Sequence, residues 1–87
     1  MKINVRLFAN FREVTGKKDV TVNVNGDTVM DVVSSLIAQY PGLRPLMLNE
    51  GAIKPYVNVL VNGKGAKPSD KIKGGDELAI FPPVSGG

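Results

Sequence analysis

The N-terminal residues alternate strictly between two faces of an extended chain. One face carries Ile3, Val5 and Leu7, and the other carries Lys2, Asn4, Arg6 and Phe8. This period of two predicts a strand over Lys2 to Phe8 with one buried face. The period breaks over Asn10 to Gly16, which predicts a helical turn. It returns over Asp19 to Val24, which predicts a second strand rich in β-branched residues.

A helix is predicted to begin at Val29. Thr28, with Asp31 three residues later, fits a capping box in which aspartate replaces the commoner glutamate. Pro41 and Gly42 end the helical pattern. One stripe at helical spacing consists of Val29, Val32, Val33, Leu36, Ile37 and Tyr40. We expect this stripe to pack against a core, because valine has a low helix propensity and packing has to stabilise the helix.

The middle of the chain is less regular. Leu43 to Pro55 contains two prolines and has no clear period, which predicts a long connection with one short helical turn. Tyr56 to Val61 has the composition of a strand. Because Leu60 opposes the alternating valines, both faces of this strand are partly apolar, and we expect it to run through the sheet interior.

Turn residues divide the C-terminal third of the chain. Asn62-Gly63 predicts a tight hairpin, and Gly74-Gly75-Asp76 predicts a turn directly before an alternating strand over Glu77 to Phe81. Four or five strands and one main helix packed on one face of a mixed sheet form an α+β domain of the β-grasp, or ubiquitin-like, fold. We expect this domain to span residues 1–81, followed by an extended, flexible C-terminal tail over residues 82–87.

Composition excludes several classes of function. The 87 residues suffice for one small domain, and the chain has neither cysteine nor histidine. Thiolate nucleophiles, imidazole bases and the usual zinc sites are therefore excluded. The carboxylates are scattered, without the spacing of an acid–base pair. We expect no metal site, no bound cofactor and no catalytic residues in the chain itself.

The charge pattern and the hydropathy of the chain indicate which kinds of partner and which cellular location to expect. The formal net charge is +3, and the lysines are interleaved with acidic residues instead of clustering beside aromatic residues, so we expect no nucleic-acid partner. No apolar run approaches the ~20 residues needed to cross a bilayer, and the N-terminus does not have the pattern of a signal peptide. We expect no membrane partner and a cytoplasmic location.

Two phenylalanines lie opposite the core positions of their strands. Alternation places Phe8 opposite Leu7, and Phe81 opposite Ile80, on the side of the sheet without the helix. If the two strands are neighbours, with a valine of the 57–61 strand beside them, the sheet exposes an apolar patch of the kind that binds a partner. The alternative is that both rings fold back over the edges of the core.

The C-terminal residues carry the candidate chemistry. Pro82 and Pro83 favour an extended path, and Gly86 and Gly87 have no Cβ, so the backbone can enter a narrow channel. The terminal carboxylate is ionised at neutral pH and is a poor electrophile until a partner activates it, for example by adenylation. Attack by sulfide or persulfide would then produce a thiocarboxylate, and attack by a lysine amine an isopeptide. The alternative is an inert terminus.

The tail Phe81-Pro82-Pro83-Val84-Ser85-Gly86-Gly87 resembles the C-terminal signature of the molybdopterin synthase small-subunit family, which includes the small archaeal modifier proteins. The resemblance extends over the whole chain. It includes Leu7-Phe8-Ala9, Arg12-Glu13, Gly16, Val57-Asn58 and Gly75-Asp76-Glu77.

The resemblance implies a sulfur carrier or protein modifier. An E1-like adenylating enzyme, which uses ATP, would activate the carboxylate of Gly87 for conversion to a thiocarboxylate. The molybdopterin synthase large subunit would then take the sulfur, or target-protein lysines would be joined to the same end. Pro82, Pro83, Val84, Ser85 and Gly86 would thread into the partner. The family's apolar partner surface corresponds here to Phe8, Val61 and Phe81. A thiamin-type sulfur carrier, or a β-grasp interaction module with an inert tail, is the alternative.

Overall fold

The computed structural model describes residues 1–82. Its strands are β1 (Lys2–Leu7), β2 (Asp19–Asn23), β3 (Leu48–Asn49), β4 (Ala52–Ile53), β5 (Asn58–Val61), β6 (Lys64–Gly65) and β7 (Glu77–Phe81). Its helices are α1 (Ala9–Thr15), α2 (Val29–Gln39), a 3₁₀ helix η1 (Pro41–Leu43) and α3 (Arg44–Met47). No helix within residues 1–82 is long and apolar enough to cross a membrane.

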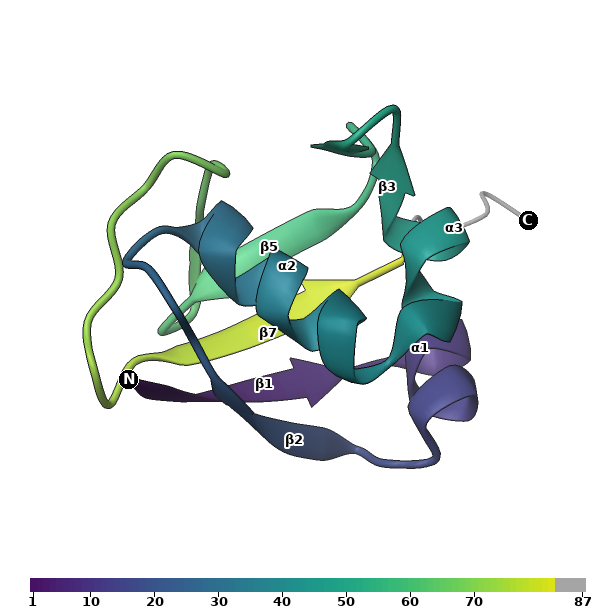
Figure 1. Ribbon diagram of the computed structural model, residues 1–87, viewed down its shortest axis with the longest axis horizontal. Helices are drawn as coiled ribbons and strands as arrows, with labels where there is room; N and C mark the ends of the chain where they lie inside the picture. The colour runs from purple at the N-terminus through teal and green to yellow at the C-terminus, as the bar shows by residue number, and fades with distance from the viewer. Residues whose placement is uncertain (83–87) are drawn as a thin grey trace.

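The main sheet is mixed and five-stranded, in the order β2-β1-β7-β5-β6. β1 and β7 run parallel at its centre, and the other neighbouring pairs are antiparallel. Helix α2 crosses one face of this sheet, as Figure 1 shows. The predicted β-grasp architecture, with one main helix over a mixed sheet, is therefore confirmed.

The core lies between α2 and the central strands. The predicted inward residues of the two parallel strands are completely buried: Ile3, Val5, Leu7, Leu78 and Ile80. The α2 stripe faces them with Val29, Val32, Val33, Leu36 and Ile37, all buried, while Tyr40 at the helix end is half-buried against the core. The two patterns read from the sequence, period two in the strands and helical spacing in α2, therefore meet in one hydrophobic layer.

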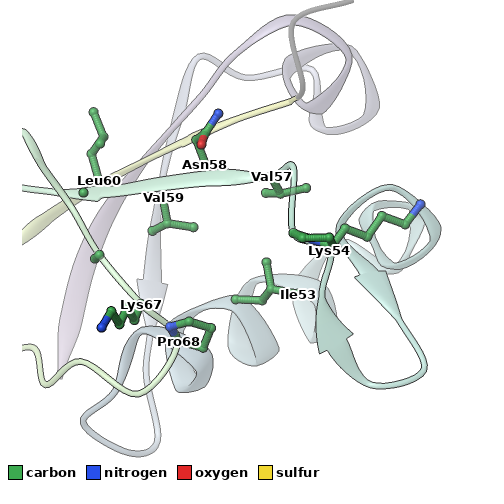
Figure 2. A pocket seen from close by; sticks show the side chains of 11 residues that line it. Ile53, Lys54, Val57, Asn58, Val59, Leu60, Lys67 and Pro68 are labelled. Carbon is green, nitrogen blue, oxygen red and sulfur yellow. The ribbon is translucent and has the colours of Figure 1, made fainter.

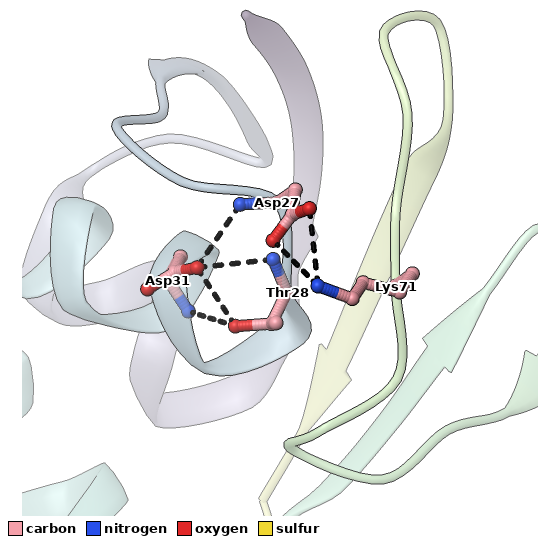
Figure 3. Close-up of polar contacts among 4 residues, drawn as sticks. All are labelled: Asp27, Thr28, Asp31 and Lys71. Atoms are coloured by element: carbon pink, nitrogen blue, oxygen red, sulfur yellow. Dashed lines mark hydrogen bonds and ion pairs between the residues drawn. The ribbon is translucent and has the colours of Figure 1, made fainter.

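The predicted capping box forms at the start of α2 and is tied to a distant loop (Figure 3). The Asp31 amide donates to the Thr28 hydroxyl at 3.2 Å, and the Thr28 hydroxyl and amide donate to the Asp31 carboxylate at 2.9 and 3.1 Å. The hydrogen bonds that the carboxylate accepts from the Thr28 hydroxyl, the Thr28 amide and the Asp27 amide lower the pKa of Asp31 below its ordinary value of 3.8.

The same helix end is joined to the segment before β7. The Val29 amide donates to the Asp70 carbonyl and the Met30 amide donates to the Pro68 carbonyl. Lys71 pairs with Asp27 at 3.1 Å, an exposed ion pair that adds little stability. The first amides of α2 thus have partners within the fold, so this helix start is a structural junction.

The prediction of a long irregular connection over Leu43 to Pro55 is wrong for most of the segment. The segment contains the end of η1, the short helix α3 and a β3–β4 hairpin, and only α3 corresponds to the predicted helical turn. Leu43 and Met47 are completely buried in the core. The hairpin turn uses Glu50 at φ 53° and Gly51 at φ 79°, and a glutamate at the first of these positions gives no recognisable turn signal.

The predicted Asn62-Gly63 turn joins β5 and β6, with φ of 50° and 85° at its two residues. Asn62 also links this hairpin to β7. Its side-chain amide donates to the buried Asp76 carboxylate at 3.0 Å, and its side-chain oxygen accepts from the Glu77 amide at 3.0 Å. The Lys73 amide donates to the same carboxylate. This hydrogen bond, together with the one from the Asn62 side chain, lowers the pKa of Asp76 below its ordinary value of 3.8.

Candidate functional site: the aromatic patch and the start of the tail

Phe8 and Phe81 stack on each other at the same end of the two central strands. Their ring centroids lie 4.2 Å apart and the ring planes differ by 8°. The parallel register pairs Leu7, the last residue of β1, with Ile80, and this brings the residues that follow them, Phe8 and Phe81, side by side. Both side chains are half-buried, and neither belongs to the core. Each ring therefore covers a face of the other on the side of the sheet away from α2.

Val61 does not lie with this stack. It pairs with the completely buried Leu78 and packs against the core, so it is on the α2 side of the sheet. Residues directly opposite each other on antiparallel strands share a face, so Val61 lies on the same face as Leu78. The expectation that Val61 lies beside Phe8 and Phe81 on one surface is therefore wrong.

Leu60 takes the place expected for Val61. It pairs with Ala79, and Ala79 alternates with the buried Leu78 and Ile80, so both residues face away from α2. Figure 2 shows the Leu60 side chain leaving β5 on the side opposite to Val59. We call Phe8, Leu60, Ala79 and Phe81 the aromatic patch.

Two arginines border the aromatic patch. The Arg12 guanidinium lies over the Phe8 ring, 5.9 Å from its centroid, and its Nε donates to the Leu7 carbonyl at 3.4 Å. Arg6 is exposed on β1, where the parallel register pairs it with Ala79. An apolar centre with guanidinium groups at its rim is a typical composition for a surface that binds protein.

The tail begins at this patch. Phe81 is the last residue of β7, and half-buried Pro82 follows it directly. The remaining predicted tail residues, Pro83, Val84, Ser85, Gly86 and Gly87, lie outside the described residues, so their roles remain predictions. The described part of the site therefore consists of the docking side chains and the first tail residue.

A separate pocket of about 430 Å³ lies along β5. Asn58 and Leu60 are among its lining residues, but Figure 2 shows that their side chains point to the other side of β5 from Val57 and Val59. Its walls include Ile53, Val57 and Val59, and its charged lining residues are Lys54 and Lys67. Lys54 Nζ donates to the Pro45 carbonyl at 2.7 Å. Among residues 1–82 there is no cluster of three or more histidine, cysteine or acidic residues that could hold a metal.

The chain is similar to known proteins along its whole length. The ThiS family matches residues 5–87. The chain is 44% identical to small archaeal modifier protein 3 of Haloferax volcanii and 39% identical to the molybdopterin synthase sulfur carrier subunit of Chlamydomonas reinhardtii, over 100% of both chains in each case. The crystal structure of SAMP1 from H. volcanii matches 100% of both chains at 40% identity with a TM-score of 0.90.

The β-grasp fold and these relatives define a ubiquitin-like protein of the sulfur-carrier and protein-modifier class. Within that class, the chain belongs to the ThiS family. The Chlamydomonas relative is a subunit of a synthase, so at least one relative works together with another protein.

Proposed function

We propose that the Gly87 carboxylate is the reactive group of this protein and that an E1-like enzyme activates it with ATP. The observation that supports this is the position of the aromatic patch. β7 ends inside the patch at Phe81, and the tail starts at the next residue. A partner that binds the patch therefore receives the tail from a fixed starting point, which reduces the conformational freedom lost when the chain end enters an active site.

The chemistry follows from the carboxylate. One of its oxygens attacks the α-phosphate of ATP, pyrophosphate leaves, and the carbonyl carbon becomes electrophilic in the acyl-adenylate. Hydrosulfide then attacks that carbon and AMP leaves, which produces the thiocarboxylate. A lysine amine attacking the same carbon loses a proton and expels AMP, which produces an isopeptide. The chain contains no cysteine, so the sulfur nucleophile has to come from outside it.

Two uses of the activated end are supported by the relatives. The similarity to a molybdopterin synthase sulfur carrier subunit supports sulfur donation to a large synthase subunit, and the similarity to small archaeal modifier proteins supports attachment to lysines of target proteins. In both uses the adenylating enzyme comes first, and the aromatic patch is the surface we propose it binds. The chain itself needs no bound cofactor, because ATP is held by the enzyme.

Mass spectrometry of the C-terminus tests this proposal. The full chain is incubated with ATP, sulfide and the E1-like enzyme of the same organism. We expect wild type to exchange one oxygen at Gly87 for sulfur. A chain lacking Gly87 should remain unmodified with unchanged stability, because its carboxylate stops ~3.3 to 3.6 Å short of the activating position.

Gly86→Val is the companion variant, with Ser85→Ala as its matched control. Valine at 86 adds side-chain atoms that a channel shaped for glycine excludes, so we expect no sulfur at its C-terminus, whereas Ser85→Ala should be modified. Equal modification of the shortened chain, or an unmodified wild type with an enzyme that adenylates another carrier, would exclude the carrier function and leave an interaction module with an inert tail.

A further inference from the structure

One edge of the main sheet is formed by β2, and within residues 1–82 no further strand pairs with that edge. The hydrogen bonds to β1 determine which backbone groups of β2 point outward. The Leu7 amide donates to the Lys18 carbonyl, and the Val24 amide donates to the Met1 carbonyl, so even-numbered residues of this segment face β1. The amides and carbonyls that point away from the sheet therefore belong to Asp19, Thr21 and Asn23. In Figure 1, β2 runs along one border of the molecule, and none of the helices in the described part of the chain lies outside it.

We propose that this edge pairs antiparallel with the same edge of a second copy, around a two-fold axis at Thr21. In this register all five residues of β2 find a partner, since Thr21 faces its own copy and Asp19 faces Asn23. Each outward-pointing residue then exchanges both of its backbone hydrogen bonds with the residue opposite. The two five-stranded sheets become one continuous sheet.

The charges at the edge favour this partner and this register. Lys17, Lys18 and Asp19 are all exposed and discourage pairing with most other strands. Around the axis at Thr21, however, Asp19 faces the neutral, exposed side chain of Asn23, and its carboxylate can accept from that amide. Lys17 likewise faces Asn25, outside the strand. An axis at Asp19 would place two carboxylates opposite each other and shorten the overlap.

The paired edge leaves the β7 and β5 residues of the aromatic patch accessible. β1 separates β2 from these strands, so Leu60, Ala79 and Phe81 do not lie at the new interface. Five residues per copy form a smaller contact than the ~1,200 to 2,000 Å² buried in stable complexes, so we expect self-association only at high protein concentration. A two-fold contact closes on itself, so it produces dimers and does not extend into larger assemblies. This inference does not depend on the chemistry proposed for Gly87.

Because the chain has no cysteine, one introduced thiol reports on the axis. Thr21→Cys places two thiols at directly opposed positions, where the Cα separation of ~5.5 Å suits a disulfide. The matched control is Ser34→Cys, an exposed position on α2. Under mild oxidation of the full chain, we expect Thr21→Cys to form covalent dimers at least about tenfold faster than the control. Equal rates would overturn the proposal.

Charge reversal at the axis provides the second test, by sedimentation velocity at millimolar protein concentration. Thr21→Lys and Thr21→Glu each place like charges opposite each other, and we expect each alone to weaken self-association roughly two- to fivefold relative to wild type. An equal mixture of the two variants should restore it. A monomeric wild type, or a mixture that associates no better than either variant alone, would refute the pairing.

Discussion

The two faces of β7 differ in what they contact. Leu78 and Ile80 are completely buried beneath α2, whereas Ala79 and Phe81, on the other face, are half-buried and belong to the aromatic patch. One strand thus contributes to the core with alternate residues and to the proposed partner surface with the residues between them. Substitutions on the first face should therefore reduce stability, and substitutions on the second should reduce binding.

The largest expected effect is on the core side. Leu36 is completely buried on α2, so Leu36→Ala should lower the free energy of unfolding by ~2 to 5 kcal/mol. Denaturant unfolding measures the loss, with Ser34→Ala on the exposed side of the same helix as control. A Leu36→Ala protein as stable as this control would show that the helix does not cover the core as described.

Phe81→Glu tests the other face. It removes one ring of the stack and places a charge in the aromatic patch, and we expect it to weaken binding to the adenylating enzyme by at least about thirtyfold, the scale of a hot-spot residue at ~2 kcal/mol. Calorimetry measures the affinity, and Ser34→Glu on the exposed side of α2 is the matched control for added charge. Unchanged affinity, or an unfolded Phe81→Glu protein, would contradict a surface role for this ring.

Leu60 and Val61 are neighbours in sequence, but their side chains lie on opposite faces of the sheet. Substituting each in turn therefore tests separately the partner surface and the core side of the sheet. We expect Leu60→Ala to reduce affinity for the adenylating enzyme and to leave the unfolding midpoint nearly unchanged. Val61→Ala should do the reverse and cost roughly 1 kcal/mol of stability, because it removes two methyl groups from a partly buried site. If both variants lose affinity, or both lose stability, the assignment of Leu60 and Val61 to different faces is wrong.

The smallest expected effect is on how the stability of the fold changes at acidic pH. Asp76 has a folded-state pKa below its ordinary 3.8, so it binds protons more readily in the unfolded chain. Its contribution to stability is therefore complete above pH 3.8 and is lost as the pH falls through the lower folded-state value. We expect Asp76→Asn to be less stable than wild type at neutral pH and to lose less stability on acidification. Urea unfolding at a series of pH values measures both, and parallel curves for the two proteins would contradict the assignment.

Local sequence signals predicted most of the fold because each has a local physical cause. The capping residues Thr28 and Asp31 lie within one turn of the helix start, and the Asn62-Gly63 turn needs only its own two left-handed residues. By contrast, β3 and β4 have two residues each and α3 has four, lengths too short to display a period. The burial of Leu43 and Met47 depends on how this segment lies against the rest of the core.

In the candidate site, too, some features follow from local sequence and others depend on the tertiary structure. The sequence by itself determined that Phe8 and Phe81 oppose the core residues of their strands, because side chains alternate along any extended chain. It could not determine which face of β5 is buried, since Leu60 and Val61 are both apolar. The register with β7 decided that, by pairing Val61 with Leu78. The stack of Phe8 on Phe81 likewise exists only because the tertiary structure sets β1 beside β7, and pairing between strands so distant in sequence depends on the whole sheet.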